Sequence, residues 1–372
     1  MAVKRPKGKM MKNNFSTKRR GRFIRTVTII LASVIVFLAL NTVALIIVYN
    51  SFFVRCERPD YSAYPGLYCY ERIEDTLPRE NISFKSADAD ISAYYYEAND
   101  PKGLVVIAPG YVAGADDYLP LTEAFVNGGY SVFSLDYTGV YDSGGRNGIG
   151  MCQSLVDLDR ALTFIGEDEE MSSLPLFLVG HSWGGYASAS VLELHPEVDG
   201  CVLIAPMYNG ATVMVEMGAM LYGDFLRIGQ PVFDVYQSAL FGEYTEYNGV
   251  RGINSTDIPV LIAQGVDDDV MTMDGLSITA HKDEITNPNV TYYYGYGLQG
   301  GHTEIWHSVE SCEYQKQIAE RIEEIYESDD EQFIAKELSS LYSSVDHRLY
   351  SEVNPELLSL VFLMFEEVVE NG

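Results

Sequence analysis

The chain of 372 residues has little cysteine, no pair of cysteines spaced for zinc, and no excess of positive charge. Its five cysteines are too few for a disulfide scaffold in a chain of this size, and no C-x-x-C pair suggests a zinc ribbon. A formal net charge of −28 argues against a nucleic-acid-binding protein. Since 47% of the residues are hydrophobic and 21% are charged, the chain is not disordered as a whole.

The basic residues that are present gather at the start of the chain. Residues 1–25 hold ten Lys and Arg residues and no acidic residue. Residues 26–54 carry no charge and are enough to span a bilayer, which takes about 20 apolar residues in a helix. A cleavable signal peptide is the alternative. However, its apolar region is about 7–15 residues long and is followed by small residues, whereas this run ends in the bulky Tyr49, Phe52 and Phe53.

We therefore predict a transmembrane signal-anchor helix over residues 26–54. Because positive charge stays on the cytoplasmic side, residues 1–25 are expected to form a disordered cytoplasmic tail, and everything after Arg55 is expected to be extracellular. This places the protein in the cell membrane as a single-pass protein. Outside the cell a disulfide between Cys56 and Cys69 is able to persist, with two unrelated thiols as the alternative.

The remainder predicts an α/β domain. Residues 55–80 are mixed in character and predict a stalk. From residue 81 onward, continuous apolar runs such as GLVVIAPG and LPLFLVG predict strands buried on both faces, and QSLVDLDRALTFI predicts an amphipathic helix. This alternation indicates a mainly parallel, doubly wound sheet over residues 81–326. The strongly acidic segment that follows predicts a helical C-terminal extension over residues 327–372.

A candidate nucleophile lies in the segment G-H-S-W-G, residues 180–184. This G-x-S-x-G pattern comes directly after the strand LPLFLV and directly before a helical segment. A serine in so tight a strand-to-helix turn is presented at the carboxyl edge of the sheet, near the positive end of the helix. The pattern therefore predicts that Ser182 attacks a carbonyl group.

With these motifs, residues 81–326 resemble the α/β-hydrolases, in particular the group around monoacylglycerol lipases, lysophospholipases and S33-type serine peptidases. In that family the catalytic residues follow the order serine, acid, histidine. The segment GVDDDV at 265–270 is similar to the family's G-x-x-D-x-x-[VI], which implies Asp268 as the acid, with Asp267 as the main alternative. The segment G-G-H after the last strand resembles the family's G-H and implies His302 as the base.

The resemblance also implies where the oxyanion and the substrate are held. The oxyanion donors are expected to be the backbone N–H groups of Trp183 and Tyr111, although the family usually has His-Gly where this chain has Pro109-Gly110. An insertion at about 207–257 corresponds to the family's lid. Its methionine and aromatic side chains suit an adaptable apolar pocket. The candidate substrate-binding residues are Met207, Tyr208, Met214, Met217 and Tyr222.

Together these features predict a membrane-anchored serine hydrolase that cleaves carboxylic esters through an acyl-enzyme. The resemblance implies a small ester or lipid substrate such as a monoacylglycerol or lysolipid. An S33-type serine peptidase and a non-catalytic binding protein of the same fold are the alternatives. The expected partners are the substrate and the membrane, without nucleic acid. No metal or organic cofactor is implied, and the oligomeric state is left open.

Overall fold

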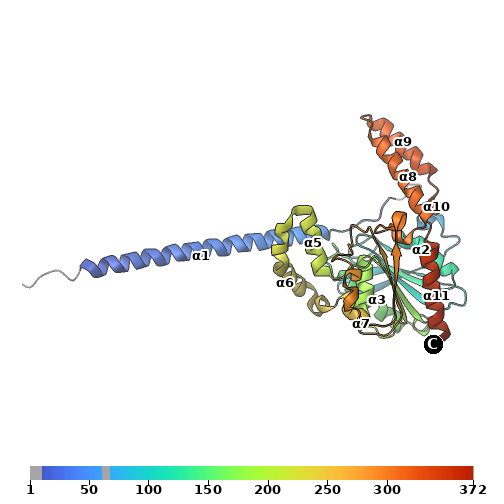
Figure 1. The fold of residues 1–372 in the computed structure, drawn as a ribbon, viewed down its shortest axis with the longest axis horizontal. Coiled ribbons are helices and arrows are strands. Elements are labelled where there is room, and N and C mark those ends of the chain that lie inside the picture. Colours follow the sequence, from blue (N-terminus) through green and yellow to red (C-terminus); the bar gives the residue numbers. More distant parts are fainter. Residues whose placement is uncertain (1–10, 61–67, 372) are drawn as a thin grey trace, which may run out of the picture.

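The computed structural model describes residues 11–60 and 68–371 (Figure 1). Within these residues one sheet is built from eight strands: β1 (Glu80–Ser86), β2 (Ala89–Tyr96), β3 (Leu104–Ala108), β4 (Ser131–Leu135), β5 (Leu176–His181), β6 (Gly200–Ile204), β7 (Val260–Gly265) and β8 (Val290–Gly295). Their order across the sheet is β1-β2-β4-β3-β5-β6-β7-β8. The pairs β1–β2 and β2–β4 are antiparallel, and all later neighbours are parallel. The predicted mainly parallel sheet is confirmed.

Helices connect these strands and cover the sheet on both sides, as in other doubly wound folds (Figure 1). The α-helices that the structure describes are α1 (Met11–Phe52), α2 (Leu119–Asn127), α3 (Gln153–Glu167), α4 (Trp183–Val191), α5 (Gly210–Tyr222), α6 (Gln230–Phe241), α7 (Gly249–Asn254), α8 (Val309–Tyr326), α9 (Glu331–Ser344), α10 (His347–Tyr350) and α11 (Pro355–Asn371).

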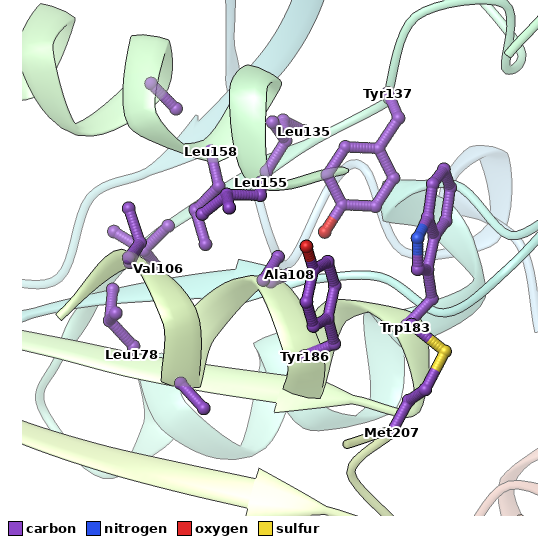
Figure 2. Close-up of a cluster of buried hydrophobic side chains, with 14 of the residues drawn as sticks. Val106, Ala108, Leu135, Tyr137, Leu155, Leu158, Leu178, Trp183, Tyr186 and Met207 are labelled. Atoms are coloured by element: carbon purple, nitrogen blue, oxygen red, sulfur yellow. The ribbon is translucent and has the colours of Figure 1, made fainter. Parts of the chain in front are cut away.

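The core has two halves because successive residues of a strand point to opposite faces of the sheet. On one face Val106 of β3 belongs to the same buried cluster as Leu155 and Leu158 of α3 (Figure 2). On the other face Val105 belongs to a cluster that includes Phe125 of α2. Both faces of the central strands are therefore buried, which explains why the sequences of these strands are continuous apolar runs.

The C-terminal segment, expected as a helical extension, contributes a core helix. In α11 the side chains of Leu357, Val361 and Phe365 are buried against the sheet. The Phe365 ring stacks on Phe177 of β5 with 4.0 Å between ring centroids. Helices α8 and α9, by contrast, pack against each other and project away from the sheet (Figure 1).

Among the described residues, one helix is long and apolar enough to cross a membrane, namely α1 from Arg19 to Phe52. None of its most apolar stretch is buried against the rest of the chain. The expectation of a disordered basic tail is wrong from Met11 onward, because the helix already begins there. A helix that has formed extends at little cost through a segment without proline, and α1 contains none. The first ten residues of the predicted tail lie outside the described residues.

The chain that leaves α1 pairs directly with the domain. Val54 forms an antiparallel bridge with Asn147, and Cys56 forms a parallel bridge with Val140. The end of the helix is thus tied to the domain within a few residues of Phe52. Residues 61–67 of the predicted stalk lie outside the described residues.

The suggested disulfide between Cys56 and Cys69 is not formed, since both thiols are free. The Cys56 Sγ lies 3.3 Å from the carbonyl oxygen of Val112. Cys69 is buried and precedes the 3₁₀ turn Tyr70–Arg72.

Candidate active site

Ser182 lies in the sharp turn between strand β5 and helix α4. Its backbone has φ 54° and ψ −111°, which is rare for a residue with a side chain and costs about 1–3 kcal/mol. Three backbone hydrogen bonds hold it there. Its N–H donates to the carbonyl of Ile204 at 2.8 Å, and its carbonyl accepts from the N–H groups of Tyr186 at 3.1 Å and Met207 at 3.2 Å. Strain of this kind at a tight strand-to-helix turn is typical of a nucleophile elbow.

Gly180 and Gly184, each two residues from Ser182, are required because the backbone passes close to both positions. A Cβ atom on Gly184 would lie 2.0 Å from the carbonyl oxygen of Ala108 at the end of β3. A Cβ atom on Gly180 would lie 2.4 Å from the carbonyl oxygen of Gly184. Because no side chain fits at either position, α4 packs directly against the ends of β3 and β5.

His302 and Asp268 form a hydrogen-bonded pair beyond the ends of β8 and β7. The Nδ1 atom of His302 lies 2.8 Å from Oδ2 of Asp268. The Asp268 side chain is buried and also accepts hydrogen bonds from the Met271 N–H at 2.7 Å and from Gln264 Nε2 at 2.8 Å. Asp267, the alternative acid, is exposed, and the structure brings Asp268 rather than Asp267 to His302.

Ser182 and His302 line the same cavity, whose volume is about 350 Å³. Among the described residues their side chains share no hydrogen bond. Catalytic hydrogen bonds are often long in proteins without substrate and tighten when the substrate binds. The cavity therefore presents a serine hydroxyl together with an imidazole that a carboxylate orients.

Two backbone N–H groups are available beside Ser182. Trp183 is the first residue of α4, and the first N–H groups of a helix have no partner within it. Tyr111 follows β3, and in the part of the chain that the structure describes its N–H donates no hydrogen bond. Both residues line the cavity. The sequence-predicted oxyanion positions and Ser182 thus lie at one place, despite Pro109 in the preceding loop.

His181 is buried beneath the site and supports it. Its Nδ1 atom lies 2.7 Å from the Tyr118 hydroxyl, and its Nε2 atom lies 3.3 Å from the carbonyl oxygen of His302. Burial, reinforced by the nearby His302, lowers the pKa of His181 to about 3. His181 is therefore neutral at physiological pH and braces the loop that carries His302.

The remainder of the cavity wall is mainly apolar. Met207 follows β6, and Met214 and Met217 come from α5 in the predicted lid. Figure 2 shows Met207 next to Trp183. Further apolar lining residues are Phe52, Met151, Val270, Met271 and Trp306.

The placement of Tyr208 in this cavity is wrong. Its ring stacks on His281, with 3.6 Å between ring centroids, and it lines a different pocket together with Asn248. Met207 and Tyr208 are consecutive in a non-helical segment, where neighbouring side chains point in opposite directions. The side chain of Tyr222 lies outside the described residues.

Phe52, Met151 and Met271 were missed by the sequence analysis. Phe52 was assigned to the anchor, and no local motif marks Met151 or Met271. Their approach to Ser182 depends on contacts between distant segments, which no spacing in the sequence reveals. Within the described residues there is no cluster of three or more His, Cys, Asp and Glu side chains that could hold a metal ion.

Comparison with known proteins supports this assignment of the fold. Residues 99–239 match the family model described as serine aminopeptidase, S33. The match includes Ser182 but ends before Asp268 and His302. A monoacylglycerol lipase of Mycolicibacterium smegmatis is 32% identical over 112 residues, which cover 30% of this chain and 40% of the lipase. The alignment thus spans about two fifths of the length of that relative.

A solved structure shares the fold at low sequence identity. The esterase Pf2001 of Pyrococcus furiosus superimposes with a TM-score of 0.52 and 17% identity, over 72% of this chain and 96% of the esterase. At this identity the likeness establishes the fold alone. Given the sheet order, the strained serine between strand and helix, and these matches, the chain belongs to the α/β-hydrolase superfamily.

Proposed function

We propose that the protein is a serine hydrolase that cleaves carboxylic esters. The observation that carries this proposal is the strained Ser182 in one cavity with His302, whose Nδ1 atom lies 2.8 Å from Asp268. A carboxylate on Nδ1 leaves Nε2 of the imidazole to accept the proton of the serine hydroxyl. The matches to an S33 family model and to a lipase favour the same class of reaction.

The proposed reaction has two stages. The Ser182 oxygen attacks the ester carbonyl carbon while His302 takes its proton, and the N–H groups of Tyr111 and Trp183 hold the resulting oxyanion. The imidazolium then protonates the departing alcohol, which leaves an acyl group on Ser182. Water, deprotonated by His302, releases the acid, and Asp268 orients the imidazole throughout.

The apolar cavity favours an ester with an apolar acyl chain. Methionine side chains line much of it, and they adapt to chains of different shape. We propose a monoacylglycerol or lysolipid as the substrate class.

We further propose that α1 anchors the protein in the cell membrane with its N-terminus in the cytoplasm and its catalytic domain outside, as its basic N-terminal end favours. Protease added to intact cells is expected to degrade the domain. Protection of the domain until the cells are lysed would contradict this orientation.

A peptidase is a second candidate because the matching family model is described as an aminopeptidase. An aminopeptidase site generally holds the substrate's positive amino terminus with a carboxylate. Among the described residues that line the cavity, the one carboxyl group is Asp117. It already accepts hydrogen bonds from the Gly114 N–H and the Tyr141 hydroxyl, and burial raises its pKa. This arrangement favours the ester over the peptide.

The test uses the full-length protein in detergent micelles and a fluorophosphonate probe, which reacts with activated serines. We expect labelling of the wild type and loss of labelling in Ser182→Ala and His302→Ala. Ser343→Ala and His347→Ala, which change the same residue types on α9 and α10, serve as controls that label like the wild type. A folded wild type that does not label would refute the proposal and favour a non-catalytic binding protein.

A substrate panel then separates the two enzymatic candidates. Short-chain esters, monoacylglycerols, lysolipids and proline-containing peptides are compared at equal concentrations of labelled sites. Faster hydrolysis of the apolar esters is the expected outcome, whereas preferential cleavage of the peptides would establish the peptidase instead.

A further inference from the structure

The anchor helix is longer than a membrane requires. Counted from Arg25, the last charged residue before the apolar run, about 20 residues at a rise of about 1.5 Å cover the hydrocarbon core of about 30 Å and end near Leu45. The last two turns of α1 therefore extend beyond the hydrocarbon core. Phe37, in the middle of the span, is 65% exposed, whereas Tyr49 is 0% exposed and Phe53 is 2% exposed. The surplus turns are thus the part of the helix that the catalytic domain covers.

We call residues 49–53 the anchor end. On one side it contacts the predicted lid, where α1 packs against helix α6 and the 3₁₀ helix Asp224–Gly229 (Figure 1). The ring of Tyr49 lies 5.9 Å from the ring of Phe233 and 5.4 Å from the ring of Tyr236, both on α6. The Tyr49 hydroxyl accepts a hydrogen bond from the Met151 N–H at 3.0 Å.

On its other side the anchor end contacts both residues proposed to bind the oxyanion. The ring of Phe53 lies 6.1 Å from that of Tyr111 and 6.5 Å from that of Trp183. The Tyr111 hydroxyl donates a hydrogen bond to the carbonyl of Phe52. The Trp183 indole donates to the Met151 carbonyl at 2.7 Å, and Met151 is the residue whose N–H is bound by Tyr49. Both proposed oxyanion residues are therefore held from the membrane side.

The anchor end also forms part of the cavity wall, because Phe52 lines the cavity that contains Ser182. With about 1.5 Å per residue, Phe52 stands only about 10 Å beyond the end of the hydrocarbon core near Leu45. The cavity thus lies within reach of the membrane surface.

We infer that the anchor end is a positioning element of the active site: residues 49–53 hold the Tyr111 and Trp183 backbone in the geometry that binds the oxyanion. This inference rests on the proposed hydrolase function. It means that a retained α1 serves catalysis as well as attachment, and that cleavage of α1 would remove a working part of the site.

The experiment compares three substitutions on α1 and the residue after it in the full-length protein in micelles. Phe53→Ala removes the ring against Tyr111 and Trp183, Phe53→Leu replaces much of its volume, and Phe37→Ala makes the same change in the exposed middle of the helix. Saturating fluorophosphonate labelling counts the folded sites. The kcat per labelled site and KM are then measured with a short-chain ester.

We expect Phe53→Ala to lower kcat per site by about tenfold or more with little change in KM, since small displacements of catalytic groups act on the transition state. Phe53→Leu is expected to recover most of the loss, and Phe37→Ala is expected to match the wild type. A merely structural role would reduce the number of labelled sites and leave the kcat of each remaining site unchanged.

A second variant keeps the test decisive if Phe53→Ala does not fold. Tyr111→Phe removes only the hydroxyl that bonds to the Phe52 carbonyl and keeps the backbone N–H, and we again expect a lower kcat at similar KM. Wild-type kcat per site in the folded variants would overturn the inference while leaving the proposed function intact. Failure of the wild type itself to label at Ser182 would refute the proposed function and the inference together.

Discussion

Replacement of Gly184 by alanine tests the packing that creates the strained turn at Ser182. The new Cβ atom would lie 2.0 Å from the carbonyl oxygen of Ala108 and 2.4 Å from that of Pro109. Both neighbours are backbone atoms, so neither can turn aside as the end of a flexible side chain would. Helix α4 and the end of β3 must therefore separate by about 1 Å before the contact reaches even 3.0 Å.

The expected loss of activity follows from the residues that lie at the ends of these two elements. Trp183 begins α4 and Tyr111 follows β3, so their separation moves apart the two N–H groups proposed to bind the oxyanion. A misplacement of about 1 Å costs about 100-fold in rate. Forcing an extra carbon into a packed site also costs about 1–3 kcal/mol of stability. We therefore expect Gly184→Ala to lower both kcat and the thermal unfolding temperature.

Gly166→Ala is the matched control, because the same atom added near the end of α3 meets nothing within 4 Å. Alanine is favoured over glycine in helices, by about 0.5–1 kcal/mol in a helix interior. This variant is expected to keep wild-type activity and a slightly higher unfolding temperature. Activity and unfolding temperature of Gly184→Ala equal to those of the wild type would refute the reasoning.

Three further predictions concern the acid, a buried carboxyl and the thiols. Asp268→Asn should lower kcat by about 10⁴-fold because the imidazole of His302 loses its orienting carboxylate. Asp267→Asn should keep a kcat near that of the wild type. Equal losses of kcat in the two variants would contradict the assignment of Asp268 as the acid. Burial raises the pKa of Asp157 from 3.8 to about 6, so the folded state holds the Asp157 proton more tightly than the unfolded state does. The resulting contribution to the free energy of unfolding is complete below about pH 4 and is lost as the pH rises to about 6. Asp157→Asn should therefore cost more unfolding free energy at pH 4.5 than at pH 7 in denaturant titrations, and the opposite order would refute the argument. Thiol titration of the denatured, unreduced protein should find five free thiols, whereas three would reveal a bridge such as Cys56–Cys69.

The anchor end changes how a soluble form of the protein should be judged. A chain that starts after residue 54 lacks Tyr49 and Phe53, both of which are buried against the domain. Removal of a buried aromatic side chain costs about 3–5 kcal/mol. Poor activity of such a truncated chain would therefore reflect a missing wall of the site as well as reduced stability.

The local features of the site were readable in the sequence because they depend on short-range geometry. The turn at Ser182 needs glycine at fixed spacing between a strand and a helix, and both requirements appear within a few consecutive residues. The alternation of apolar runs with amphipathic helices likewise determined the doubly wound sheet. The apolar helix α1 was equally predictable from the sequence, because a long run of apolar residues is recognised from composition alone.

Contacts between distant segments were decided only by the tertiary structure. The sequence left Asp267 and Asp268 as alternatives, and the choice depends on which carboxylate the end of β7 turns toward His302. Tyr208 was misplaced because composition cannot tell which of two consecutive side chains faces a cavity. Phe52 was read as membrane anchor because its neighbours in sequence are apolar. Its place in the wall of the cavity that contains Ser182 arises from packing across the fold, which local spacing does not encode.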